Sequence, residues 1–72
     1  MSTTVDARGL SCPQPVLMTM DEIKASGSGE ITILVDTDTS RENVSRAAES
    51  QGWQVADVQE KGEEYSITIL KG

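Results

Sequence analysis

The first third of the chain has the pattern of a strand followed by a helix. Residues 5–8 are typical of a short edge strand, and residues 9–11 of a turn. Pro13 and Pro15 come next, and proline is favoured in the first helical turn because its missing N–H would have no partner there. We therefore predict a helix from about residue 13 to residue 25, ended by the Ser-Gly-Ser-Gly run at residues 26–29.

Apolar side chains recur at helical spacing within this first helix. The predicted core-facing side consists of Val16, Met20 and Ile23, with Leu17 beside it. The next apolar run, residues 31–35, is β-branched and lacks clean alternation. It predicts a central strand that is buried on much of both faces and ends at residues 36–38.

A second helix is predicted from capping signals. Thr39 and Glu42 have the spacing of a capping box, so we expect the helix to begin at Thr39. Gly52 is placed to end it, because glycine readily adopts the left-handed conformation that follows a helix. The apolar face of this helix is narrow and consists of Val44, Ala47 and Ala48.

Two strands complete the pattern. Trp53 is predicted as a core residue at the start of the third strand, residues 61–64 as a hairpin turn, and residues 65–70 as an alternating fourth strand. Helical crossovers imply parallel pairing of the early strands, and the hairpin implies antiparallel pairing of the last two. We predict an α+β fold over a single domain, residues 1–72: a two-layer α/β sandwich of order βαβαββ, with two helices on one face of a mixed four-stranded sheet. The strand order stays open.

The composition is acidic and excludes some classes of partner. The chain has 12 Asp and Glu residues against 6 Lys and Arg residues, a net charge of −6 and only two aromatic residues. Nucleic-acid binding usually needs a basic stripe, often with aromatic platforms, so direct binding of nucleic acid is not expected. An anionic membrane surface is disfavoured for the same reason. An acidic surface suits a basic protein partner.

Location and covalent cross-links follow from the N-terminus and the cysteine count. The first residues lack a basic start and an apolar run, and no apolar stretch reaches the roughly 18 to 20 residues that a membrane-spanning helix needs. The single cysteine excludes an internal disulfide. We expect a cytoplasmic protein without membrane insertion.

Cys12 is the main candidate for chemistry, because the sequence contains no histidine. The usual general base is therefore missing, and one cysteine without histidine cannot form the common zinc sites. Gly27 and Gly29 do not belong to a phosphate-binding loop, since the Lys-Ser/Thr of such loops is missing. We expect no bound metal and no bound cofactor.

The position of Cys12 favours a reactive thiolate. At a helix start the first backbone N–H groups are unpaired, and the helix dipole adds about half a positive charge. The thiol pKa of a cysteine at such a position can be lowered to about 3.5 to 7.5. Pro13 restricts Cys12 to extended geometry, Pro15 stiffens the first turn, and Arg8 upstream is placed to add positive charge. A lone cysteine is, however, commonly an inert buried residue, and the residues alone leave both interpretations open.

Three charged residues in the middle of the chain are further candidates. Asp36 and Asp38 follow the central strand, where they are placed to hold a basic group of a partner or to tune Cys12. The simpler interpretation of both is a strand-end turn and a helix-start charge. Arg41 opposes the dipole of the second helix, which hints at a binding role, while a solvated surface arginine is the plainer alternative.

One sequence motif resembles a known family. Residues 5–16 contain Gly9 and Leu10 and, after one residue, Cys12-Pro13-Gln14-Pro15. This motif resembles the signature of the TusA/SirA family of small sulfur carriers, and the resemblance extends over essentially the whole chain. Residues 35–36, 41–44 and 48–53 are most similar to the N-terminal domain of YedF proteins, a branch linked to selenium metabolism.

The resemblance implies a function for Cys12. It would accept sulfane sulfur as a covalent persulfide from a cysteine desulfurase or a rhodanese, and pass it to an acceptor protein. We therefore expect a sulfurtransferase-like carrier rather than a stand-alone enzyme, and a monomer, because Cys12 must face two partners in turn. Members that serve tRNA thiolation carry several basic residues along the first helix, whereas residues 18–24 contain only Lys24, which argues against that role.

Two other functions stay open. The chain could be a non-catalytic interaction or regulatory module in which Cys12 is structural, which predicts slow alkylation of its thiol. A redox enzyme is disfavoured, because the chain has no second cysteine to resolve an oxidised Cys12.

Overall fold

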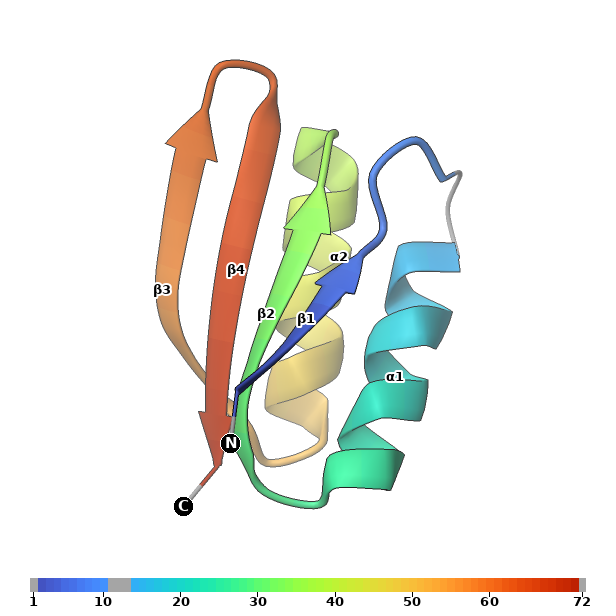
Figure 1. Cartoon of the computed structure of the whole chain (residues 1–72), viewed down its shortest axis with the longest axis vertical. Coiled ribbons are helices and arrows are strands. Elements are labelled where there is room, and N and C mark those ends of the chain that lie inside the picture. The colour runs from blue at the N-terminus through green and yellow to red at the C-terminus, as the bar shows by residue number, and fades with distance from the viewer. Residues whose placement is uncertain (1, 11–13, 72) are drawn as a thin grey trace.

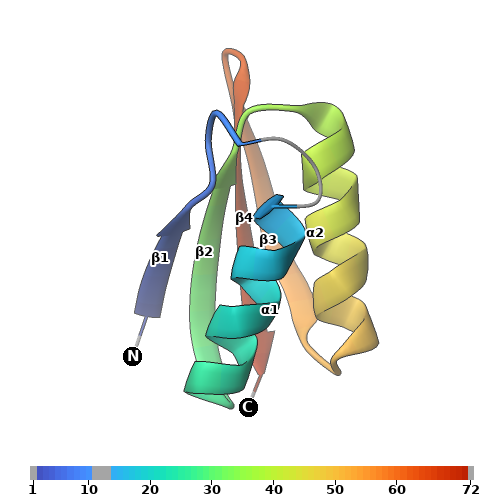
Figure 2. The same ribbon diagram turned by 90° about the vertical axis from the view of Figure 1, so that its right-hand side faces the viewer.

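Two helices and a four-stranded sheet make up the residues that the computed structural model describes, 2–10 and 14–71. Both helices pack on the same face of the sheet, so the molecule has two layers (Figure 1; Figure 2). The predicted α+β fold and βαβαββ order are confirmed. In chain order the elements are β1 (Ser2–Asp6), α1 (Gln14–Ser26), β2 (Gly29–Val35), α2 (Asp38–Ser50), β3 (Gln54–Lys61) and β4 (Glu64–Lys71).

The strands of the sheet lie in the order β1-β2-β4-β3. β1 is parallel to β2, and β4 is antiparallel to both of its neighbours, which confirms the predicted pairing. The crossover through α1 returns the chain beside β1, as is usual for such connections. The crossover through α2 instead carries the chain one strand further, and β4 then fills the place between β2 and β3.

The core lies between the sheet and the helices. Ile31, Ile33 and Val35 on β2 are fully buried and alternate with the half-buried Thr32 and Leu34. The strand is central, as predicted, but the expectation of burial on much of both faces holds for one face only, because both helices lie on that face and Thr32 and Leu34 on the other are half-buried. The buried apolar residues are Val5, Ala7, Ile23, Ile31, Ile33, Val35, Val44, Ala48, Trp53, Ile67 and Ile69.

α1 begins and ends within one residue of its predicted bounds, but its buried face is rotated. The fully packed residues are Pro15, Thr19 and Ile23 rather than Val16, Met20 and Ile23. Thr19 tolerates burial because its hydroxyl donates to the Pro15 carbonyl oxygen at 2.8 Å, which satisfies its polar atom within the helix. Leu17, expected beside the apolar face, is 51% exposed.

The predictions for the first strand, the last turn and Trp53 can each be compared with the structure. β1 begins three residues and ends two residues earlier than the predicted strand at 5–8, because the chain already turns at Arg8 and Gly9. The predicted hairpin turn at 61–64 is confirmed, with Gly62 at φ +62° between β3 and β4. Trp53 is 3% exposed, as expected for a core residue.

α2 begins at Asp38, one residue before the start at Thr39 that the capping-box spacing predicted. Its N-cap is Thr37, whose backbone is extended and whose hydroxyl accepts a hydrogen bond from the Ser40 N–H at 3.1 Å. Thr39 lies inside the helix and is exposed. The helix ends before Gly52, which has φ +83° and confirms the predicted stop.

Candidate functional site

The carboxyl ends of β1 and β2 meet at one edge of the sheet, because these strands are parallel. The β3–β4 turn lies at the same edge, since Tyr65 near the start of β4 pairs with Val35 at the end of β2. Both helices also begin here, at the top of Figure 1. We call this region the carboxyl edge. It brings together the predicted candidates Arg8, Gly9, Asp36, Asp38 and Arg41.

Cys12 lies outside the described residues, together with Ser11 and Pro13. Its predicted role therefore rests on the sequence. The structure describes the segments on both sides, residues 7–10 upstream and α1 downstream. α1 begins two residues after Cys12 along the chain, which agrees with the predicted helix start near residue 13.

Arg8 binds two carboxylates from two strands. Its Nε and Nη2 each donate to the Asp6 carboxylate at 2.9 Å, and its Nη1 donates to Glu64 Oε1 at 3.2 Å. These bonds lower the pKa of Asp6 from its ordinary value of 3.8 to about 2, and they raise the pKa of Arg8. β1 and β4 are the two neighbours of β2, so Arg8 bridges across the end of β2. The charge of Arg8, predicted to act near Cys12, is thus balanced by two carboxylates.

Asp36 contacts the segment that leads to Cys12. Its Oδ2 accepts a hydrogen bond from the Gly9 N–H at 2.8 Å, across 27 positions of sequence. Gly9 has φ +76°, a left-handed conformation that disfavours residues with a Cβ. Gly9 and Asp36 were both candidates from sequence, and their hydrogen bond connects the β1–α1 and β2–α2 connections.

Asp38 and Arg41 form a second pair at the carboxyl edge. Arg41 Nη2 and Nε donate to Asp38 Oδ1 at 2.7 and 2.9 Å, and this bond raises the pKa of Arg41. The guanidinium lies 5.6 Å from the centre of the Tyr65 ring, in cation–π geometry. Burial is the main cause of the raised pKa of Tyr65. Asp38 thus offsets the unfavourable place of Arg41 near the helix start.

Glu64 and Tyr65 are the participants that sequence reasoning missed. Both belong to the start of β4, and they meet Arg8 and Arg41 only because β4 lies beside β2. No sequence signal pointed to them, since the strand order was open.

The two remaining motif residues differ in exposure. Leu10 is 38% exposed. Pro15 is fully buried, and its carbonyl accepts the Thr19 hydroxyl. Pro15 therefore fixes the first turn of α1 by packing as well as by its ring.

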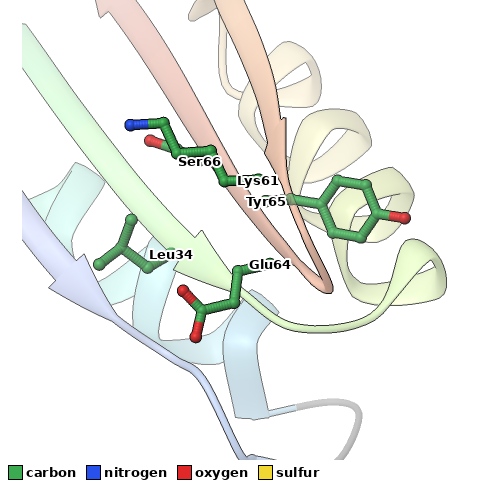
Figure 3. A pocket seen from close by; sticks show the side chains of 5 residues that line it. All are labelled: Leu34, Lys61, Glu64, Tyr65 and Ser66. Carbon is green, nitrogen blue, oxygen red and sulfur yellow. The ribbon is translucent and has the colours of Figure 1, made fainter.

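A shallow hollow of about 220 Å³ lies at the β3–β4 turn. Figure 3 shows that the Tyr65 ring points toward α2, while the Leu34 and Glu64 side chains lie on the other side of the strands. Lys61 and Ser66 complete its lining. The Glu64 carboxylate is already bound to Arg8, so this hollow offers no unused acidic group.

Two other kinds of site are not found within residues 2–10 and 14–71. No group of three or more His, Cys, Asp or Glu side chains there is arranged to hold a metal ion. None of the helices formed by these residues is long and apolar enough to cross a membrane.

Comparison with known proteins places the chain in a family. The family model described as sulfurtransferase TusA matches residues 3–71. The crystal structure of a SirA-like protein from Desulfitobacterium hafniense superposes with a TM-score of 0.90, at 37% sequence identity and over 97% of each chain. Fold, sequence identity and the match over almost the full length agree, and the chain belongs to the TusA family of sulfurtransferases.

Proposed function

We propose that this protein is a sulfur carrier that holds sulfane sulfur as a persulfide on Cys12 and passes it to a partner protein. The observation that carries the proposal is the match to the TusA family over residues 3–71. That range contains the only cysteine of the sequence, within the motif Cys12-Pro13-Gln14-Pro15.

The proposed reaction exchanges one S–S bond for another. The Cys12 thiolate attacks the outer sulfur of a donor persulfide, the S–S bond of the donor breaks, and the donor cysteine leaves as a thiolate. In the second step, a thiolate of the acceptor attacks the outer sulfur held on Cys12, and Cys12 leaves as a thiolate. Neither step needs an oxidant or a reductant, because the outer sulfur only changes its partner.

This chemistry fits a chain without histidine. A thiolate attacks without a general base, so the reaction requires an ionised Cys12 rather than an acid–base pair. The start of α1, two residues further along the chain, supports ionisation through its unpaired N–H groups and dipole.

Intact-mass spectrometry after incubation with a cysteine desulfurase and free cysteine tests the proposal. The wild-type chain is expected to gain the mass of one sulfur atom, and a thiol reductant should remove it. Cys12→Ser keeps the size and polarity of the side chain and should gain no sulfur. No gain in the wild type, or an equal gain in Cys12→Ser, would contradict the proposal.

A non-catalytic interaction module predicts a different result. In that case Cys12 is structural, and its alkylation would be slow, with the pH dependence of an ordinary thiol near pKa 8.5. Fast alkylation near neutral pH supports the carrier instead.

The similarity to YedF proteins adds a finer proposal, a pathway other than tRNA thiolation, with selenium metabolism as the candidate. Selenium offered to the donor enzyme in place of sulfur, in the same mass measurement, tests this point. A chain that loads sulfur but never selenium would argue against the selenium branch.

A further inference from the structure

We infer that Asp36 is a positioning residue for Cys12, because its carboxylate holds the segment that leads to the cysteine. The inference deepens the proposed site, and it rests on the proposed function only for the choice of Cys12 as the reacting residue. Asp36 acts through the Gly9 backbone and is not proposed to touch sulfur.

Three successive residues after β1 are each held by hydrogen bonds or ion pairs to other parts of the molecule. Ala7 is 1% exposed, and its N–H donates to the Leu34 carbonyl oxygen of β2 at 2.8 Å. Arg8 is bound by carboxylates on β1 and β4. Gly9 donates to Asp36 in the β2–α2 connection. Asp36 therefore supplies the last upstream fixed point, three residues before Cys12.

The downstream fixed point lies in the first turn of α1. Pro15 belongs to α1 and is fully buried, and its carbonyl oxygen accepts a hydrogen bond from the Thr19 hydroxyl. Residues 10–14 thus connect two fixed points, and Cys12 is the middle residue of that stretch. Loss of the Asp36 bond gives Gly9 more conformations, and this is the route by which we infer that Asp36 acts on Cys12.

Two effects of Asp36 on the Cys12 thiol have opposite signs. If Asp36 positions the cysteine at the positive end of α1, loss of the Gly9 bond raises the thiol pKa, because the thiolate leaves that favourable place. If Asp36 acts only through its negative charge, removal of that charge lowers the thiol pKa. The sign of the change therefore distinguishes positioning from simple electrostatics.

Three substitutions separate the bond from the charge. Asp36→Asn keeps an acceptor oxygen and removes the charge. Asp36→Glu keeps the charge and moves the carboxylate by one methylene, while Asp36→Ala removes both. The measurement is the rate of Cys12 alkylation by iodoacetamide across pH, followed by intact mass, which needs no sulfur donor. We expect the alkylation rate of Asp36→Asn to stay within about twofold of the wild-type rate. Asp36→Ala and Asp36→Glu should react about three- to tenfold more slowly at neutral pH, with a raised thiol pKa of Cys12.

Two outcomes would overturn the inference. One is a lowered thiol pKa of Cys12 in both Asp36→Asn and Asp36→Ala, and the other is unchanged alkylation of Cys12 in both Asp36→Ala and Asp36→Glu. Thermal unfolding checks that each variant is folded. If Asp36→Ala does not fold, the comparison of Asp36→Asn with Asp36→Glu tests the inference. Asp57→Ala is the matched control, because Asp57 lies on β3 at the opposite edge of the sheet from β1, its carboxylate accepts from the Gln59 side chain, and its loss should leave alkylation unchanged. A chain that shows the Asp36 effect but takes up no sulfur would refute the proposed function and leave the positioning role intact.

Discussion

The two connections from strand to helix at the carboxyl edge differ in length and in what holds them. The β2–α2 connection has two residues, Asp36 and Thr37, whereas the β1–α1 connection runs from residue 7 to residue 13. Both join parallel strands to helices on the same face of the sheet. Two residues therefore suffice for this geometry, and the longer connection exceeds what the fold alone requires.

The polar groups of the two connections serve different ends. In the short connection, Thr37 caps α2 by accepting the Ser40 N–H, which stabilises the helix. In the long connection, Arg8 and Gly9 bind groups outside any helix, and they hold the segment before Cys12. Functional residues are often found in loops held by a rigid scaffold, and the long connection has this character.

Among these predictions, substitution of Gly9 should have the largest effect, on both the stability of the fold and the reactivity of Cys12. Gly9→Ala places a Cβ at φ +76°, which costs roughly 1–2 kcal/mol, and the relaxed backbone turns the N–H away from Asp36. Chemical denaturation should show the loss of stability, and Cys12 alkylation at neutral pH should slow by about threefold or more.

Gly62→Ala is the matched control for this prediction. Gly62 has φ +62°, and no atom lies within 4 Å of an added Cβ at either Gly9 or Gly62. The stability cost should therefore be similar, while Cys12 alkylation should stay as in the wild type. Equal alkylation in the two variants would show that the backbone conformation at Gly9 has no special effect on Cys12.

A smaller effect, on stability alone, is expected at Thr37. Thr37→Ala removes the N-cap acceptor of α2 and should lower the free energy of unfolding by about 1 kcal/mol, with Cys12 alkylation unchanged. Thr39→Ala is the control, because Thr39 is exposed inside the helix, where alanine is favoured. A larger loss from Thr39→Ala than from Thr37→Ala in urea unfolding would contradict the observed cap.

The contrast between Thr37 and Thr39 shows how far local patterns reach. Thr39 has the Glu partner of a capping box, but the cap is decided by where the extended backbone of the connection ends, which depends on β2. The helices and strands were predictable because their side chains follow the periods of helix and sheet. The carboxyl edge was not, since the bond between Gly9 and Asp36 spans 27 positions and requires the β1–β2 register. Glu64 and Tyr65 likewise required the unpredicted place of β4.

The smallest effect concerns the ion pair that begins the long connection. Arg8 lowers the pKa of Asp6 from 3.8 to about 2. The ion pair therefore stabilises the folded state fully at pH values above 3.8, and this contribution to stability is lost as the pH falls through about 2. Both side chains are substantially exposed, at 41% and 56%, so solvent screens the pair and the change in stability should be small. NMR titration of the Asp6 carboxyl carbon reports the pKa directly.

Arg8→Ala should return the pKa of Asp6 only part of the way to 3.8. The side-chain bonds are lost, but the backbone N–H of residue 8 still donates to Asp6 Oδ1, at 3.2 Å in the wild type. Arg46→Ala, which removes an exposed ion pair to Glu42 on α2, should leave the Asp6 titration unchanged. An Asp6 pKa that stays near 2 in Arg8→Ala would mean that the backbone bond alone holds the carboxylate. Arg8 would then bind the long connection to β4 through Glu64 without tightening it against β1.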